Sequence, residues 1–144
     1  MAVSVPPHSG SGVRSSRILI VDDDPMVLRA LRRLLLGARP AWEIDMAESV
    51  EAASVLLDAK VYDVVVTDLH MPAATGLELL ERLKAERPDV MRVIHSSQLE
   101  AGHQIDAGLA HALVAKSGRP DELIPVIDWA LDQRKRRLRD SVGY

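Results

Sequence analysis

The chain has 144 residues, 47% of them hydrophobic and 27% charged, which is typical of one soluble globular domain. It contains no cysteine, which excludes a disulfide scaffold, a cysteine-ligated zinc site and a thiol nucleophile. The net charge of −3, together with the lack of a membrane-length apolar run and of a secretion signal, predicts a cytoplasmic protein that is not an electrostatic nucleic-acid binder.

The composition divides the chain into three parts. Residues 1–16 are rich in Ser, Gly, Pro and Val and follow no helical or strand period, so we expect a disordered leader or an expression remnant there. Residues 17–134 alternate between strand and helix patterns and form the predicted domain. Residues 135–144 are expected to be a basic tail or the beginning of a linker. The basic run from Arg134 to Arg139 is more typical of a solvated helix end than of a nucleic-acid site.

The first predicted element is a fully buried strand over residues 17–21, where four apolar residues follow an arginine. Asp24 and Pro25 then predict a helix start, because an N-cap carboxylate is followed by proline at the first helical position. Gly37 is the predicted left-handed end of this helix. Residues 42–46 alternate between apolar and acidic side chains, which predicts a short strand near a sheet edge.

A second helix is expected to begin behind Ser49, which suits an N-cap. Residues 64–67 (VVVT) predict another buried strand, since Val and Thr suit a pleat that is covered on both faces. A third helix is predicted from Gly76 to about Arg87, before a proline. Its apolar face is expected to hold Leu77, Leu80 and Leu83, with Leu79 beside them.

Residues 91–95 and 112–115 predict the last two strands. Between them, residues 98–109 contain two glycines and few apolar side chains, which indicates a short or mobile helix. The last helix is expected either to have Pro120 as its first residue or to follow Asp121 as its N-cap. The first choice places Pro125 inside the helix, where it would cause a kink, and the second places it at the edge of the first turn.

Five alternations of strand and helix predict an α/β fold, a doubly wound (βα)5 domain with a five-stranded parallel sheet and helices on both faces. In such a sheet the carboxyl ends of the strands lie at one edge, and ligands bind in the crevice beyond them. Chemistry is therefore expected where the predicted strands end.

Polar side chains follow four of these strands, namely Asp22 and Asp23 the first, Asp68 the third, Ser96 the fourth and Lys116 the fifth. Carboxylates brought so close together repel one another unless a cation is present, and oxygen ligands favour Mg²⁺. A hydroxyl and an ammonium beside them suit the oxygens of a phosphoryl group. The pattern predicts a magnesium-dependent phosphoryl-transfer site.

Each of these residues also has an ordinary structural explanation. An aspartate after a strand often caps a turn, and a serine or lysine there can be a plain surface group. Their joint occurrence at four strand ends favours the functional interpretation. The five histidines show no metal-site spacing and are expected to be surface or packed imidazoles. His70 is the exception, because it lies two residues after Asp68 and could border the site.

These motifs resemble the receiver domain of two-component response regulators. Residues 18–25 (ILIVDDDP) are similar to the first strand and acidic pair of that family. Residues 68–72 (DLHMP), followed by Gly76, resemble its phosphoacceptor motif. Ser96 and Lys116 match the Ser/Thr and Lys that follow its fourth and fifth strands. The resemblance implies a flavodoxin-like sheet with the strand order 2-1-3-4-5.

The resemblance also implies a function. Asp68 would accept a phosphoryl group from a sensor histidine kinase or a histidine phosphotransfer protein. The domain would not be an enzyme beyond catalysing its own phosphorylation and dephosphorylation. It would act on a downstream protein or on an output domain outside this chain. It would not contact membranes or bind nucleic acid directly. A second copy of the chain would be a further partner. The homodimer would form through the face that consists of residues 98–109, residues 112–115 and the last helix.

Site roles follow from the same resemblance. Asp23 would bind Mg²⁺ directly and Asp22 mainly through water, with Asp68 as a further ligand. His70 would offer its main-chain carbonyl to the metal. Ser96 and Lys116 would hold phosphoryl oxygens and convey phosphorylation to the signalling face.

The signalling face departs from the family pattern at two positions. Ser117 stands where the family usually has a proline, and Leu113 stands where an aromatic switch residue is usual. A tyrosine-type rotamer switch is therefore not expected in its usual form.

Two other functions compete with a phosphorylatable receiver. Asp22 and Asp24 form the Asp-x-Asp pattern of Mg²⁺-dependent haloacid-dehalogenase-type phosphatases. Against this, Met26 stands where Thr or Val is expected, and the chain lacks a second acidic pair near its end. The other alternative is a pseudo-receiver that is never phosphorylated and acts purely by interaction, which the complete set of site residues disfavours.

Overall fold

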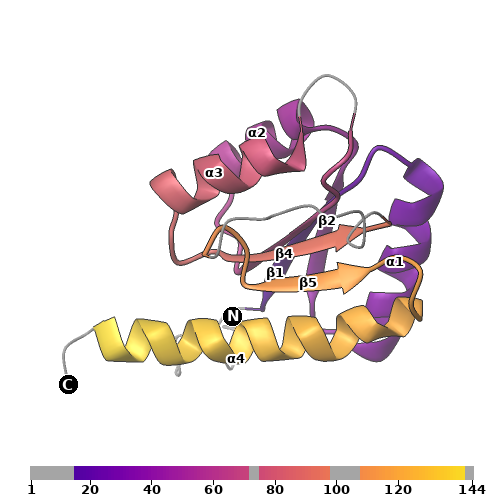
Figure 1. The fold of residues 1–144 in the computed structure, drawn as a ribbon. Helices are drawn as coiled ribbons and strands as arrows, with labels where there is room; N and C mark the ends of the chain where they lie inside the picture. The colour runs from indigo at the N-terminus through magenta and orange to yellow at the C-terminus, as the bar shows by residue number, and fades with distance from the viewer. Residues whose placement is uncertain (1–14, 72–74, 98–107, 142–144) are drawn as a thin grey trace, which may run out of the picture.

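The computed structural model describes residues 15–71, 75–97 and 108–141. They form a five-stranded parallel sheet in the order β2-β1-β3-β4-β5 (Figure 1), which confirms the predicted fold class and strand order. The strands are β1 (Arg17–Val21), β2 (Glu43–Ala47), β3 (Val64–Thr67), β4 (Met91–Ser96) and β5 (Ala112–Ala115). The helices are α1 (Pro25–Ala38), α2 (Val50–Ala59), α3 (Gly76–Glu86) and α4 (Leu123–Ser141), with a 3₁₀ turn η2 at Pro120–Glu122.

The helices cover both faces of the sheet, with α2 and α3 on one side and α1 and α4 on the other (Figure 1). Aliphatic side chains that alternate along the strands supply one core for each face. Ile18 and Val64 belong to the core under α1 and α4, whereas Leu19 and Val65 belong to the core under α2 and α3. Two buried faces explain why the strands are near-continuous runs of apolar residues.

The helix starts agree with the sequence. The Asp24 carboxylate accepts a hydrogen bond from the Met26 N–H at 2.9 Å, and Pro25 occupies the first helical position of α1. The Ser49 hydroxyl accepts from the Ala52 N–H at 3.0 Å at the start of α2. These caps satisfy N–H groups that the first turn of a helix leaves without a partner.

Two predictions about helices are wrong. Gly37 does not end α1, because the helix continues to Ala38 and its C-cap is Arg39. Leu77 does not belong to the buried face of α3 and is 38% exposed, whereas Leu79, Leu80 and Leu83 are buried. Leucines at adjacent positions of a short helix fit two overlapping stripes, and the sheet buries only one of them.

The last helix begins later than either predicted start. Pro120 opens a 3₁₀ turn, and the α-helix begins at Leu123, so Pro125 lies in its first turn, where a missing N–H costs little. The α4 helix then continues to Ser141, beyond the expected end of the domain at Arg134. The helix expected within residues 98–109 falls largely outside the described residues, as does most of the expected leader.

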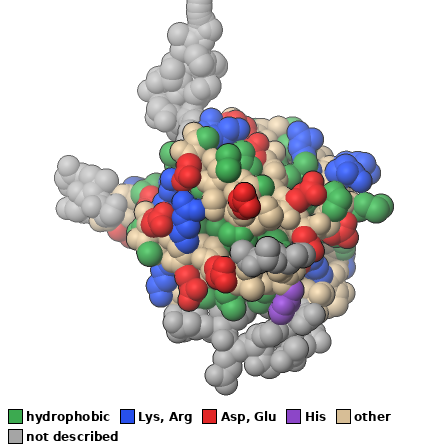
Figure 2. Space-filling model, turned by 90° about the horizontal axis from the view of Figure 1, so that it is seen from above, with side chains coloured by type: hydrophobic (Ala, Val, Ile, Leu, Met, Phe, Trp, Pro, Cys, Tyr) green, Lys and Arg blue, Asp and Glu red, His purple; other side chains and the backbone are tan. Residues whose placement is uncertain are grey.

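The molecule presents a mixed surface on its α2 and α3 side. Figure 2 shows acidic, basic and hydrophobic side chains interspersed on the face seen from above Figure 1. Arg82 of α3 pairs there with Asp58 at 3.1 Å and with Glu86 at 3.2 Å. Among the described helices, none has the length and apolar character required to cross a membrane.

Candidate functional site

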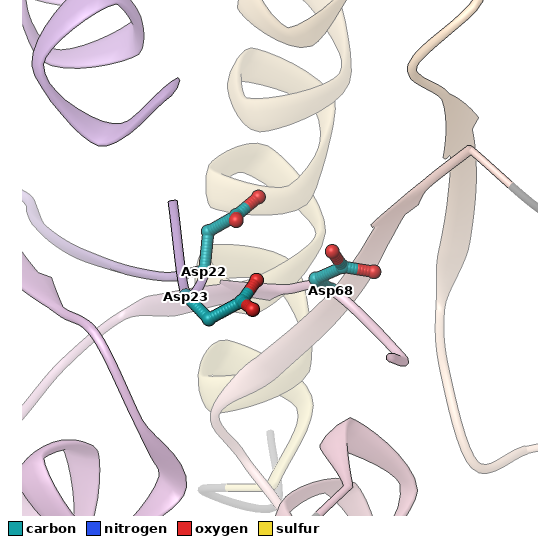
Figure 3. A group of neighbouring side chains, drawn as sticks. All are labelled: Asp22, Asp23 and Asp68. Atoms are coloured by element: carbon teal, nitrogen blue, oxygen red, sulfur yellow. The ribbon is translucent and has the colours of Figure 1, made fainter. Parts of the chain in front are cut away.

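The ends of β1 and β3 form the centre of the site. Val21 is paired with Thr67 in the last rung between these strands, so Asp22 and Asp68 follow side by side. The Asp68 N–H donates to the Val21 carbonyl at 3.0 Å, which extends the ladder by one step. Figure 3 shows the carboxylates of Asp22, Asp23 and Asp68 gathered at this edge.

The three carboxylates form a compact acidic group. One oxygen of each lies within 4.8 Å of the others. Asp22 and Asp68 are 2% and 6% exposed, whereas Asp23 is exposed to solvent. Backbone N–H groups orient the two buried acids: Asp24 donates to Asp22 Oδ1 at 3.0 Å and His70 donates to Asp68 Oδ1 at 3.2 Å. One carboxylate is thus open to an incoming ligand while two are fixed.

Lys116 joins the two buried acids. Its Nζ donates to Asp22 Oδ2 at 2.6 Å and to Asp68 Oδ2 at 2.8 Å. Burial lowers the pKa of Lys116, but the hydrogen bonds and charges of the two carboxylates outweigh burial, so the pKa is raised above its ordinary value. The ammonium is therefore charged at neutral pH and partly compensates the acidic group.

Ser96 and His70 complete the set of predicted residues. Ser96 is the last residue of β4 rather than the residue after it, and it is fully buried. The Ser96 carbonyl accepts a hydrogen bond from the Lys116 N–H at 2.9 Å, so the end of β5 lies beside Ser96. The His70 backbone lies in the turn after Asp68, and its side chain is exposed. All six predicted site residues therefore lie on the turns and strand ends at one edge of the sheet.

The donor set fits a hard cation. Three carboxylates supply only oxygen, and a single ammonium leaves the group net negative. Mg²⁺ prefers oxygen ligands and is commonly bound through one or two carboxylates. The residues are thus chemically suited to magnesium, with Lys116 as a competing cation.

Gly76 supports the site in a way that the sequence did not reveal. A Cβ built on Gly76 would lie 1.9 Å from the backbone oxygen of Asp68, far closer than any side chain tolerates. The Gly76 N–H also donates to the Leu69 carbonyl at 3.2 Å. The start of α3 therefore packs directly against the turn that carries Asp68. A glycine at a helix start is the signal, but it does not indicate which backbone is approached.

His95 is a second residue that the sequence did not mark. It precedes Ser96 in β4, is 7% exposed and interacts electrostatically with Lys116, Asp22 and Asp68. A histidine inside a predicted buried strand gives no indication of its partners until the neighbouring strands are placed.

The comparisons with known proteins agree with this geometry. The profile of the response regulator receiver domain matches residues 18–128. The chain is similar to the hydrogenase transcriptional regulatory protein HoxA of Bradyrhizobium diazoefficiens, with 31% identity over 88% of this chain and 26% of that protein. It is also similar to the two-component response regulator ARR2 of Arabidopsis thaliana, with 32% identity over 88% of this chain and 19% of that protein. The chain thus spans about a quarter or less of these two relatives.

A solved structure has the same fold and a related sequence. The response regulator protein TrrA of Thermotoga maritima, in complex with Mg²⁺-BeF, superposes with a TM-score of 0.73 and 29% identity. The alignment covers 81% of this chain and 99% of that one.

Proposed function

Since this chain belongs to the family of response regulator receiver domains of two-component systems, we propose that it is a phosphorylatable switch whose phosphoacceptor is Asp68. The observation that carries the proposal is the pairing of a buried Asp68 with Lys116 beside two further carboxylates. The phosphoryl donor would be a phosphohistidine of a sensor kinase or of a phosphotransfer protein.

The reaction assigns a task to each group. An Asp68 carboxylate oxygen attacks the phosphorus atom, and the P–N bond to the donor imidazole breaks, with its electron pair returning to the ring nitrogen. Lys116 already donates to Asp68 at 2.8 Å and would hold an oxygen of the phosphoryl group as its charge develops. The buried Ser96 hydroxyl would donate to another oxygen, since β4 and β5 end side by side.

Asp22, Asp23, Asp68 and the main-chain carbonyl of His70 would hold the magnesium ion. When bound, Mg²⁺ would neutralise the charge that accumulates on the phosphoryl oxygens. Asp23 is the exposed member of the acidic group and is therefore the first carboxylate that a cation from solvent meets. The TrrA relative, crystallised with Mg²⁺-BeF, supports a metal-dependent site of this class.

The phosphoryl signal would be read by another protein or by an output domain outside this chain. HoxA is named as a transcriptional regulatory protein, and it is several times longer than the matched region. In this chain Leu113 of the edge strand β5 is 54% exposed, so this edge offers an aliphatic side chain where an aromatic switch is usual in the family. We propose this β5–α4 edge as the signalling face, with a homodimer as one form of its use.

The test is phosphorylation by acetyl phosphate with Mg²⁺, followed by intact mass spectrometry. The wild-type protein should gain one phosphoryl adduct, which disappears when EDTA replaces Mg²⁺. Asp68→Asn should not form it, while Asp58→Asn, which changes an exposed aspartate on α2, should form it normally. An undiminished adduct on Asp68→Asn would refute the assignment. Steady hydrolysis of p-nitrophenyl phosphate that requires Asp22 would instead indicate a phosphatase.

A further inference from the structure

His95 and Lys116 are neighbours on one face of the sheet. His95 is paired with Val114 in the β4–β5 register, and Lys116 lies two residues beyond Val114, so both side chains project to the side of α1 and α4. Met91 and Val93 precede His95 on that side and belong to the core together with Val114. His95 is therefore the last side chain of β4 on this face, next to the acidic group, and it follows two apolar residues.

The two side chains also line the same pocket, which has a volume of about 210 Å³. The rest of its wall is apolar and comes from Val27, Ala30 and Leu31 of α1 and from Pro120. His95 is 7% exposed and the Lys116 side chain is 21% exposed, so neighbouring residues cover most of both side chains. The pocket is space beside Lys116 that its flexible side chain can enter.

The imidazole can sit beside an ammonium because it is neutral. Burial lowers the pKa of His95, and the charge of Lys116 lowers it further, while Asp22 and Asp68 act in the opposite direction with a smaller effect. A neutral ring does not repel the lysine, and its volume occupies space that the lysine could otherwise enter.

From this arrangement we propose that His95 is a positioning residue for Lys116. Its ring forms the wall that directs the lysine side chain toward Asp22 and Asp68 and away from the pocket under α1. Since the inference rests on the proposed phosphorylation of Asp68, it concerns how the ammonium is held there and not whether Asp68 is the acceptor.

The inference predicts two effects of opposite sign. When Lys116 is displaced, the phosphoryl group loses a charge-assisted hydrogen bond, so phosphorylation slows. Lys116 also neutralises Asp22 and Asp68, two of the carboxylates that would hold Mg²⁺, and its displacement should strengthen Mg²⁺ binding. General loss of structure would weaken both.

The experiment compares His95→Ala, which opens the wall, with His95→Leu, which keeps its bulk. Mg²⁺ affinity is measured by titration calorimetry, and the phosphorylation rate is measured with acetyl phosphate and intact mass. His95→Ala should slow phosphorylation about three- to tenfold and tighten Mg²⁺ binding about two- to fivefold, the range expected for partial loss of one charged hydrogen bond. His95→Leu should change neither by more than about twofold.

A double-mutant cycle separates action through Lys116 from a separate effect. In a Lys116→Met background, His95→Ala should change neither the rate nor the Mg²⁺ affinity. His95→Ser provides a second small side chain if circular dichroism shows that His95→Ala does not fold. Parallel losses of Mg²⁺ binding and phosphorylation, or additive effects with Lys116→Met, would overturn the inference. An unphosphorylated wild-type protein would contradict the proposed function instead, and the Mg²⁺ titrations would still test the position of Lys116.

Discussion

His111 connects the beginning of β5 to β4 through hydrogen bonds of both its backbone and its ring. Its N–H donates to the Arg92 carbonyl at 2.7 Å, and its Nδ1 accepts from the Arg92 N–H at 2.9 Å. Burial lowers the pKa of His111 to about 4, and the positive charges of Arg92 and Arg137 contribute further. A protonated ring would lose Nδ1 as an acceptor, so the folded protein holds the neutral form.

This histidine should make the protein less stable in mild acid. The unfolded chain binds a proton at His111 below a pKa of about 6.5, whereas the folded chain does so only near pH 4. The contribution of neutral His111 to stability is thus complete above pH 6.5 and is lost as the pH falls toward 4. We expect the wild-type protein to lose on the order of 2 kcal/mol over this window through this group alone.

The measurement is the free energy of unfolding in urea at several pH values for wild type and for His111→Asn. The asparagine oxygen can accept the Arg92 N–H in place of Nδ1 and does not titrate. Carboxylates titrate in the same window, but they contribute equally to both proteins and cancel in the difference. The stability of the wild-type protein relative to that of His111→Asn should fall by about 2 kcal/mol as the pH falls from 6.5 to 4, because only the wild-type protein has a group at this position that titrates. Parallel pH profiles would contradict this explanation.

At the scale of the element, α1 contains a glycine that the helix does not need. Gly37 is exposed within the last turn, and a Cβ added to it would have no atom within 4 Å. Gly37→Ala should therefore stabilise the protein by about 0.5–1 kcal/mol, because alanine has the better helix propensity and restricts the unfolded chain. Gly108, with a φ of +94°, is the matched control, and Gly108→Ala should destabilise by about 1 kcal/mol. The urea midpoints of the two variants measure these changes in stability. A loss of stability in Gly37→Ala would show that residue 37 is not helical.

There is a physical reason why the sequence predicted the strands and the convergence of the candidate site residues at their ends. Buried parallel strands require apolar runs, and parallel strands end at one edge, so Asp22, Asp68 and Lys116 had to lie near one another. Local patterns were less informative within helices. Gly37 fits both a helix end and a helix interior, and Leu77 fits an apolar stripe that the sheet leaves exposed.

The polar residues inside β4 could not be interpreted before the fold was known. Arg92 is 4% exposed and donates to the Leu109 carbonyl at 2.8 Å and to the Gly108 carbonyl at 3.1 Å. These two acceptors are main-chain oxygens, which carry no sequence signal. His95 likewise acquires a role only when β5 brings Lys116 beside it.

At the scale of the whole molecule, one buried ion pair connects the last helix to the sheet at the edge opposite the proposed phosphorylation site. Arg134 of α4 contacts Asp63 Oδ1 at 2.9 Å, with side-chain exposures of 15% and 9%. Asp63 Oδ2 accepts the Arg17 N–H at 2.8 Å, so one carboxylate joins α4 to the beginnings of β1 and β3. The first residue of the predicted solvated basic run is therefore a packed structural contact.

Breaking this contact should cost stability without changing the chemistry. Arg134→Met keeps the aliphatic stem but leaves a buried Asp63 without its cation, which should destabilise the protein by about 2–4 kcal/mol. The control is Arg136→Met, since Arg136 pairs with Asp132 on the surface at exposures of 62% and 54%. Loss of that exposed pair should cost less than about 0.5 kcal/mol.

Urea unfolding measures the stability of both variants, and acetyl phosphate should phosphorylate both folded variants at the wild-type rate. Equal stability losses would mean that the Arg134–Asp63 contact does not hold α4 on the sheet, and a slower Arg134→Met reaction would mean that this contact influences the distant site.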